Sequence, residues 1–136
     1  MTDPTVLAPQ RLCAEYKRLF DVQDIDGLRE LRAEGCTLID HRSGPFVGYT
    51  GQLPPPVASF DTRIELIELL ACDERAIAML AAVRGTAPDT GAFEVAFGAV
   101  DVVEDGRYVR IELFDPDDPD AILARYSDLA EAAAQP

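Results

Sequence analysis

Residues 36–42 read Cys36-Thr37-Leu38-Ile39-Asp40-His41-Arg42, and they carry the clearest structural signal in the chain. The apolar start is typical of a short β-strand, and this strand ends in three ionisable side chains. His41 is the single histidine of the protein. Upstream, Tyr16 lies on an apolar helical face. The pattern therefore indicates a pocket with an acid or base at its floor.

Two helices are expected before this strand. Residues 8–20 repeat apolar side chains at the helical period; these are Leu12, Tyr16, Leu19 and Phe20. A second helix is expected to begin near Asp24, a suitable N-cap, and to stop at Gly35.

After the strand, residues 43–60 break every regular pattern. Pro54-Pro55-Pro56 excludes a regular helix there. The segment also carries apolar side chains such as Phe46 and Tyr49. We therefore expect an irregular folded loop that covers another part of the protein.

The rest of the chain predicts a meander of strands and a last helix. The expected strands cover residues 62–71, 75–84, 92–103 and 107–114. Asp105-Gly106 is a strong signal for a tight turn between the last two strands. Asp118, with Pro119 at the first helical position, is expected to open the final helix. The order predicts an α+β fold with one antiparallel sheet and its helices on one face.

Length and charge limit the function. The 136 residues fit one domain, 1–136, with an alanine-rich tail at 130–136. Twenty-five acidic against 12 basic residues give a formal net charge of −13. This charge repels phosphate backbones and anionic membranes, so neither nucleic acid nor a membrane is an expected partner. No apolar run is long enough to span a membrane.

The cysteines and the histidine predict neither a metal nor a cofactor. Cys13, Cys36 and Cys72 share no metal or redox spacing, and no glycine-rich nucleotide loop is present. The start of the chain lacks the basic and apolar regions of a secretory signal. Free thiols in a reducing, cytoplasmic compartment are expected.

The element order resembles the nuclear transport factor two-like superfamily, within it most of all the ketosteroid isomerases and SnoaL-like polyketide cyclases. The resemblance covers roughly residues 8–116 and rests on Tyr16, Asp24-Ile25-Asp26, 36–40, 102–107 and 112–115. It implies an α+β fold in which a cone-shaped, curved antiparallel (mixed) sheet wraps around the N-terminal helices and encloses a cavity. In this family the outer sheet face often pairs with a second subunit.

The resemblance also implies roles for individual residues. Tyr16 matches the isomerase tyrosine on the first helix, and Asp40 matches the carboxylate base at the end of the first strand. The isomerases add a protonated carboxylic acid on the penultimate strand. Alignment by the turn at Gly106 places Gly98 there, so this donor is expected to be missing. His41 stands where the isomerases have a proline. It is expected to help in catalysis or to anchor the following loop.

A ligand cavity is expected from the residue pattern and the resemblance together. The small side chains on one face of the strand 92–103 leave room for a ligand. The expected lining is Leu12, Leu38, Phe46, Tyr49, Ala96, Gly98, Val100, Ile111, Leu113 and Asp115. The opposite face carries Phe93 and Phe97 and would need cover, which predicts a homodimer through the outer sheet face.

Simpler interpretations remain open for the same residues. Asp40 could pair with Arg42 on the same strand face. Tyr16 could be a packed core residue. Asp115 could belong to the turn that leads into the last helix.

Three functions follow from this pattern. The first is a small-molecule cavity protein, acting as a cofactor-free acid/base isomerase or cyclase on an apolar, polyketide- or steroid-like carbonyl compound. The second is a non-catalytic ligand-sensing or dimerisation module of a regulatory protein. The third is an epoxide or ester hydrolase in which Asp40 activates a water molecule.

Overall fold

The computed structural model describes residues 7–42, 61–87 and 91–134. The elements in these ranges are α1 (Ala8–Asp21), α2 (Ile25–Glu30), β1 (Arg32–Asp40), β2 (Asp61–Cys72), β3 (Ala76–Ala87), β4 (Gly91–Glu104), β5 (Arg107–Phe114) and α3 (Pro119–Ala134). The predicted loop 43–60, with Phe46 and Tyr49, lies outside the described residues. No helix in these ranges is both long enough and apolar enough to cross a membrane.

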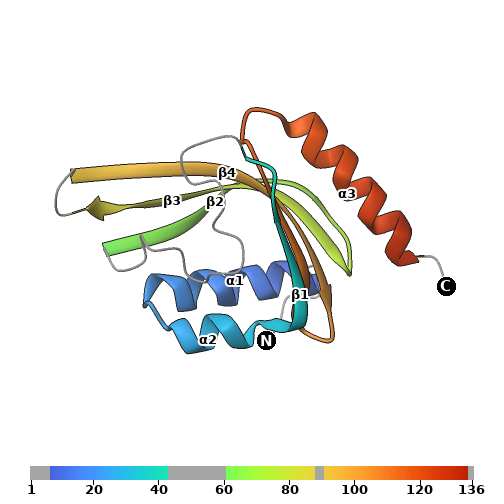
Figure 1. Ribbon diagram of the computed structural model, residues 1–136, viewed down its shortest axis with the longest axis horizontal. Helices are drawn as coiled ribbons and strands as arrows, with labels where there is room; N and C mark the ends of the chain where they lie inside the picture. The colour runs from blue at the N-terminus through green and yellow to red at the C-terminus, as the bar shows by residue number, and fades with distance from the viewer. Residues whose placement is uncertain (1–6, 43–60, 88–90, 135–136) are drawn as a thin grey trace.

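The strands form one strongly bent sheet in the order β1-β5-β4-β3-β2 (Figure 1). Neighbouring strands are antiparallel, except that β1 lies parallel to β5. Helices α1 and α2 lie on the concave side of the bend, and α3 lies on the convex side (Figure 1). The predicted α+β class with a curved mixed sheet around the N-terminal helices is confirmed.

The position of α3 corrects the expectation that all helices share one face. Its Ile122 is fully buried against Ala78 and Val100 of the sheet. The Tyr126 hydroxyl donates a hydrogen bond to Asp73 Oδ2 over 2.9 Å. The convex face is therefore partly covered by the chain itself. The homodimer expected through the outer sheet face stays a prediction.

Local signals in the sequence explain several element boundaries. Asp24 caps α2, because its side chain accepts a hydrogen bond from the Gly27 N–H over 2.9 Å. Asp118 caps α3 in the same way through Ala121, over 3.1 Å. Gly35 was expected to stop the second helix, but it lies inside β1 with a φ of 79°. There it allows the register of β1 against β5 to shift.

The concave side holds the larger core. Leu19, Phe20 and Leu28 pack against Val83 of the sheet, and a second cluster joins Leu12 to Val103 and Tyr108. Burial of a side chain such as Leu28 stabilises the fold by about 1.5–3 kcal/mol. This packing holds α1 against the bend of the sheet.

Polar contacts attach α1 to the sheet edge formed by β2. Lys17 Nζ donates to the Ile64 carbonyl over 2.8 Å, and Asp21 Oδ1 accepts from the Ile64 N–H over 3.1 Å. These side chains satisfy backbone groups that an edge strand leaves unpaired. They fix the distance between the helix and the strand on one side of the cavity described next.

Candidate functional site

A cavity of about 240 Å³ lies between α1 and the concave face of the sheet. Its wall is almost entirely apolar, which suits a hydrophobic small molecule. All five strands and α1 contribute to it; examples are Tyr16, Leu38, Met79, Phe97, Tyr108 and Leu113.

Asp101 of β4 is the most unusual residue in this wall. It is 4% exposed, and among the described residues its Oδ1 atom has no hydrogen-bond partner. Burial raises the pKa of this carboxyl to about 7. Near neutral pH a large part of Asp101 is therefore protonated and can donate a hydrogen bond into the cavity.

Asp101 was not among the expected site residues, because alignment by the turn at Gly106 gave Gly98 as the match to the isomerase acid. A buried acid on the penultimate strand is thus present after all, three residues further along the chain. One signal could have found it: Asp101 is the single charged residue between Val95 and Val103. An isolated charge within an apolar strand is rarely buried without a partner or a function.

Tyr16 of α1 also lines the cavity, as expected. Its ring lies edge-on to Tyr108, with centroids 6.2 Å apart, and stacks with Phe20 at 6.1 Å. Burial, and next the nearby Asp101 carboxyl, raise the pKa of the Tyr16 phenol. Tyr16 therefore stays neutral and keeps its O–H as a donor.

Two further neutral groups, the Tyr108 hydroxyl and the Cys13 thiol, line the cavity together with Tyr16 and Asp101. The Tyr108 hydroxyl donates to Cys13 Sγ over 3.4 Å. Burial raises the pKa of the Cys13 thiol to about 12 and that of Tyr108 well above its ordinary value. This end of the cavity is consequently a cluster of uncharged or readily protonated groups.

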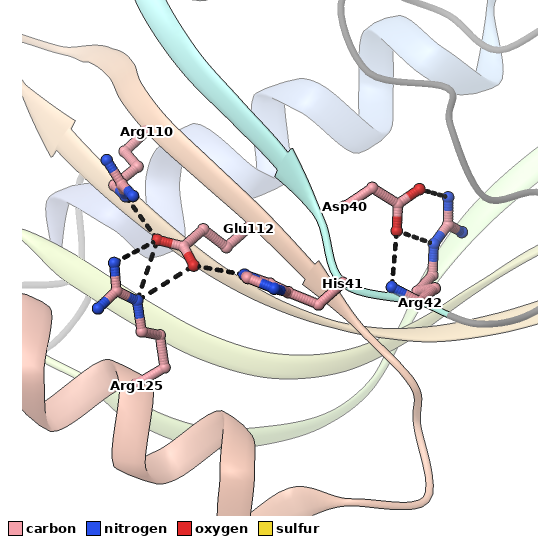
Figure 2. Close-up of polar contacts among 6 residues, drawn as sticks. All are labelled: Asp40, His41, Arg42, Arg110, Glu112 and Arg125. Carbon is pink, nitrogen blue, oxygen red and sulfur yellow. Dashed lines mark hydrogen bonds and ion pairs between the residues drawn. The ribbon is translucent and has the colours of Figure 1, made fainter.

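Asp40, the expected base, is engaged by Arg42 (Figure 2). Arg42 Nε donates to Asp40 Oδ1 over 2.9 Å, and an Nη atom donates to Oδ2 over 2.8 Å. The Arg42 main-chain N–H adds a bond to Oδ1 over 3.0 Å. The Asp40 side chain is 2% exposed. The simpler interpretation from the sequence, an Asp40–Arg42 pair, describes the observed geometry.

His41 points to the opposite side of the sheet, because consecutive side chains of a strand alternate. Its Nε2 lies 2.8 Å from Glu112 Oε1, and its ring stacks on Phe114 with centroids 4.7 Å apart. Figure 2 shows this group apart from the Asp40 pair. His41, which was expected to help in catalysis or to anchor the following loop, therefore lies on the convex face next to Glu112.

Glu112 is the centre of that second group. It accepts hydrogen bonds from Arg125 of α3 and Arg110 of β5 (Figure 2). Burial alone would raise the pKa of Glu112, but the bonds from Arg125, Arg110 and His41 lower it to about 2. The buried carboxylate thus stays charged and joins α3 to the sheet.

The remaining predicted lining residues lie only partly in the cavity wall. Leu38, Ile111 and Leu113 line the cavity. Leu12 packs in the core with Val103 instead, and Asp115, past the end of β5, is not part of the described cavity wall.

The cavity role expected for Ala96, Gly98 and Val100 is wrong. Gly98 is in contact with Ile122 of α3: a Cβ added to it would lie 2.3 Å from the Ile122 Cδ1 atom. Val100 packs against the same side chain, and Ala96 shares this side of the strand. The small residues make room for a helix, whereas the larger Phe97 faces the cavity.

No metal site emerges in the ranges described: no three or more histidine, cysteine, aspartate or glutamate side chains gather as metal ligands there. Polar side chains in the cavity wall include those of Tyr16, Asp101 and Arg42.

Comparison with known proteins agrees with the fold. No protein-family model and no curated protein matches the sequence. Rv0760c from Mycobacterium tuberculosis aligns with a TM-score of 0.68 at 13% identity, over 85% of this chain and 96% of that one. It has also been solved in complex with estradiol-17β-hemisuccinate.

Two further solved structures share the same architecture. The Δ5-3-ketosteroid isomerase from Mycobacterium sp. aligns with a TM-score of 0.63 at 15% identity, over 80% of this chain and 93% of that one. A putative polyketide cyclase from Sinorhizobium meliloti aligns with a TM-score of 0.52 at 21% identity, over 76% of this chain and 93% of that one. The chain therefore has the nuclear transport factor two-like fold that its sequence resembles.

Proposed function

We propose that this protein binds an apolar small molecule and holds one of its oxygen atoms between Asp101 and Tyr16. The buried Oδ1 atom of Asp101, which has no hydrogen-bond partner among the described residues, carries the proposal. A buried polar group without a hydrogen bond is costly, and a ligand oxygen in the cavity would satisfy it. A protonated Asp101 and the Tyr16 phenol are both donors, so they suit a carbonyl or phenolic oxygen.

The cavity wall favours a largely hydrophobic ligand, such as a steroid or an aromatic polyketide. Phe97, Met79 and Leu113 supply apolar contacts along the concave face. The complex of Rv0760c with a steroid ester supports this ligand class by likeness of fold.

Binding, rather than turnover, is the function that this geometry supports best. An isomerase or cyclase needs a free base beside the ligand, and a hydrolase needs one to activate water. Asp40 is the base that both mechanisms would use, and Arg42 occupies both of its oxygens. The alternative of a non-catalytic ligand-sensing protein therefore has the stronger support.

Binding of estradiol and of 17-hydroxyprogesterone, measured by isothermal titration calorimetry, tests the proposal. We expect Asp101→Leu to weaken binding about 5- to 150-fold, since the lost hydrogen bond is worth about 1–3 kcal/mol. Asp101→Asn keeps a donor and should retain most of the affinity. Tyr16→Phe should weaken binding by a similar factor.

Glu94→Gln is the matched control, because Glu94 lies exposed on the same strand and pairs with Arg84. It should bind like the wild type. Equal affinity of Asp101→Leu and the wild type, with both folded by circular dichroism, would contradict the proposed contact.

A further inference from the structure

Asp101 has two protonation states, and each of them suits a different kind of ligand. The residue is 4% exposed in the cavity wall, and its Oδ1 atom has no hydrogen-bond partner among the described residues. A carbonyl oxygen only accepts hydrogen bonds, so it suits the protonated carboxyl. The ionised carboxylate also only accepts, so it requires a ligand that donates, and a cationic donor forms the strongest such bond. Since the pKa of Asp101 is about 7, both states are populated near neutral pH.

The aromatic rings near Asp101 suit a cation. Tyr16 and Tyr108 line the cavity, and their rings lie edge to face with centroids 6.2 Å apart. Burial, and next the charge of Asp101, raise the pKa of Tyr16, so this phenol lies within reach of the carboxylate. An ammonium group close to the face of a tyrosine ring is attracted by the ring electrons. A cation at Asp101 is therefore stabilised by the rings as well as by the carboxylate.

The titratable groups packed around Asp101 stay uncharged near neutral pH. Burial raises the pKa of each of these thiols and phenols, which are Cys13 and Tyr16 of α1, Cys36 of β1, Cys72 of β2 and Tyr108 of β5. On β3 the residue in register with Asp101 is the apolar Ile77. Arg32 of β1 acts on Tyr16 and Cys36, whereas burial is the cause of the raised pKa of Asp101. A bound cation is thus the counter-charge that this end of the cavity lacks.

The other charged side chains of the described cavity wall each have a partner of opposite charge. The pairs are Lys17–Asp21, Arg42–Asp40 and Glu65–Arg84. Pairing offsets the repulsion that Lys17 and Arg42 exert on a cationic ligand. The net charge of −13 acts in the same direction, because a negative field raises the local concentration of cations.

We propose that the cavity also binds apolar amines in their protonated form, with an ammonium N–H donating to Asp101 Oδ1 beside the rings of Tyr16 and Tyr108. This inference rests on the proposed function only in that both kinds of ligand occupy the same cavity. In its ionised form Asp101 accepts a hydrogen bond from an amine, and in its protonated form it donates one to a ketone.

Two probes of nearly the same shape test this inference. They are 2-adamantanamine and 2-adamantanone, and their binding is measured by isothermal titration calorimetry at pH 5.5, 7 and 8.5. The amine stays protonated throughout, because an aliphatic ammonium has a pKa of about 10. With Asp101 titrating near pH 7, we expect the amine to bind about 30-fold more tightly at pH 8.5 than at pH 5.5. The ketone should bind more weakly at the higher pH.

Proton release gives a second measurement on the wild type. At pH 6 most of Asp101 is protonated, so an amine that binds the ionised form displaces about one proton into the buffer. Titrations in buffers of different ionisation enthalpy count this proton. A cavity that only takes up the hydrocarbon cage releases none. Amine binding without proton release would therefore overturn the inference.

Asp101→Asn separates the two ligands, because it removes the charge and keeps a donor in a side chain of nearly the same shape. We expect its amine affinity at pH 8.5 to fall about 10- to 150-fold, the range of a hydrogen bond to a charged group, and its proton release to disappear. Its ketone affinity at pH 5.5 should stay within about threefold of the wild-type value. Glu94→Gln removes the same charge from an exposed position on the same strand and should bind both probes with wild-type affinity.

The two proposals fail in different ways. If the ketone and the steroids bind while the amine binds no more tightly at pH 8.5 than at pH 5.5, the amine site is overturned and the proposed function stands. Unchanged amine affinity in Asp101→Asn that is folded by circular dichroism also overturns the amine site. If the amine binds with the expected pH dependence and neither the ketone nor the steroids bind, the proposed function is wrong and the amine site stands. If none of these molecules binds, both proposals are refuted.

Discussion

Replacing Asp101 by asparagine should change how stability depends on pH. The pKa of Asp101 is about 7 in the folded protein, against an ordinary value of 3.8. Between these values the folded state binds the proton and the unfolded state does not. The contribution of Asp101 to stability is therefore fully present below about pH 3.8 and is lost as the pH rises through about 7.

The magnitude follows from the two pKa values. Each pKa unit corresponds to about 1.36 kcal/mol, so the complete loss is about 4 kcal/mol. Most of it falls within an accessible range: between pH 5 and pH 8 the wild type should lose about 2–3 kcal/mol through this group alone. Asp101→Asn has nearly the same shape and no titrating carboxyl, so it should lack this decrease.

Urea unfolding at pH 5, 6, 7 and 8, followed by circular dichroism, gives the free energy of unfolding of both proteins. The stability of Asp101→Asn relative to the wild type should increase steadily with pH. Asp105→Asn is the control, because it removes the same charge from the exposed turn of the same hairpin. A difference between wild type and Asp101→Asn that stays constant from pH 5 to pH 8 would refute the reasoning.

Further predictions concern the attachment of α3 and the thiol in the cavity wall. Gly98→Ala should destabilise the protein by about 1–3 kcal/mol in urea unfolding, and Ile122→Val should recover part of this loss by removing the clashing methyl group; equal losses with and without Ile122→Val would contradict this packing. The ionised Glu112 should contribute stability above about pH 4.5, and this contribution is lost as the pH falls through about 2. Glu112→Gln should therefore lower the free energy of unfolding by about 3–5 kcal/mol at pH 7 and by clearly less at pH 3, measured by thermal unfolding. Cys13, with its pKa at about 12, should resist iodoacetamide at pH 8 in the folded protein and react once the protein is unfolded in urea. Rapid labelling of the folded wild type at a site that is lost in Cys13→Ser would contradict the burial of this thiol.

Short-range signals were sufficient for most elements. Asp24 and Asp118 cap helices because their side-chain oxygens accept hydrogen bonds from backbone N–H groups at the helix start. This interaction depends only on residues that are neighbours in the chain. The Asp105-Gly106 turn depends on backbone conformation alone, and both residues have positive φ. Gly35 was misread because a glycine with positive φ serves equally well after a helix and in a strand bulge.

The candidate site was predicted only in part. Tyr16, Leu38 and Leu113 were placed in the cavity correctly, on the residue pattern and the family resemblance together. Asp101 was missed, and Gly98 was assigned to the wrong side of β4. Both faces of that strand are apolar, so alternation separates two faces without saying which one a helix covers.

The sequence by itself determined the order of helices and strands, the capped helix starts, the tight turn at Gly106 and the likeness to a cone-shaped fold, since these depend on neighbours in the chain. The tertiary structure decided what the ionisable residues do. It placed α3 on the convex face, paired Asp40 with Arg42 and left the Oδ1 atom of Asp101 buried without a hydrogen-bond partner among the described residues. Charge, burial and hydrogen bonding depend on residues brought together from distant parts of the chain, and these contacts exist only once the sheet has bent around α1.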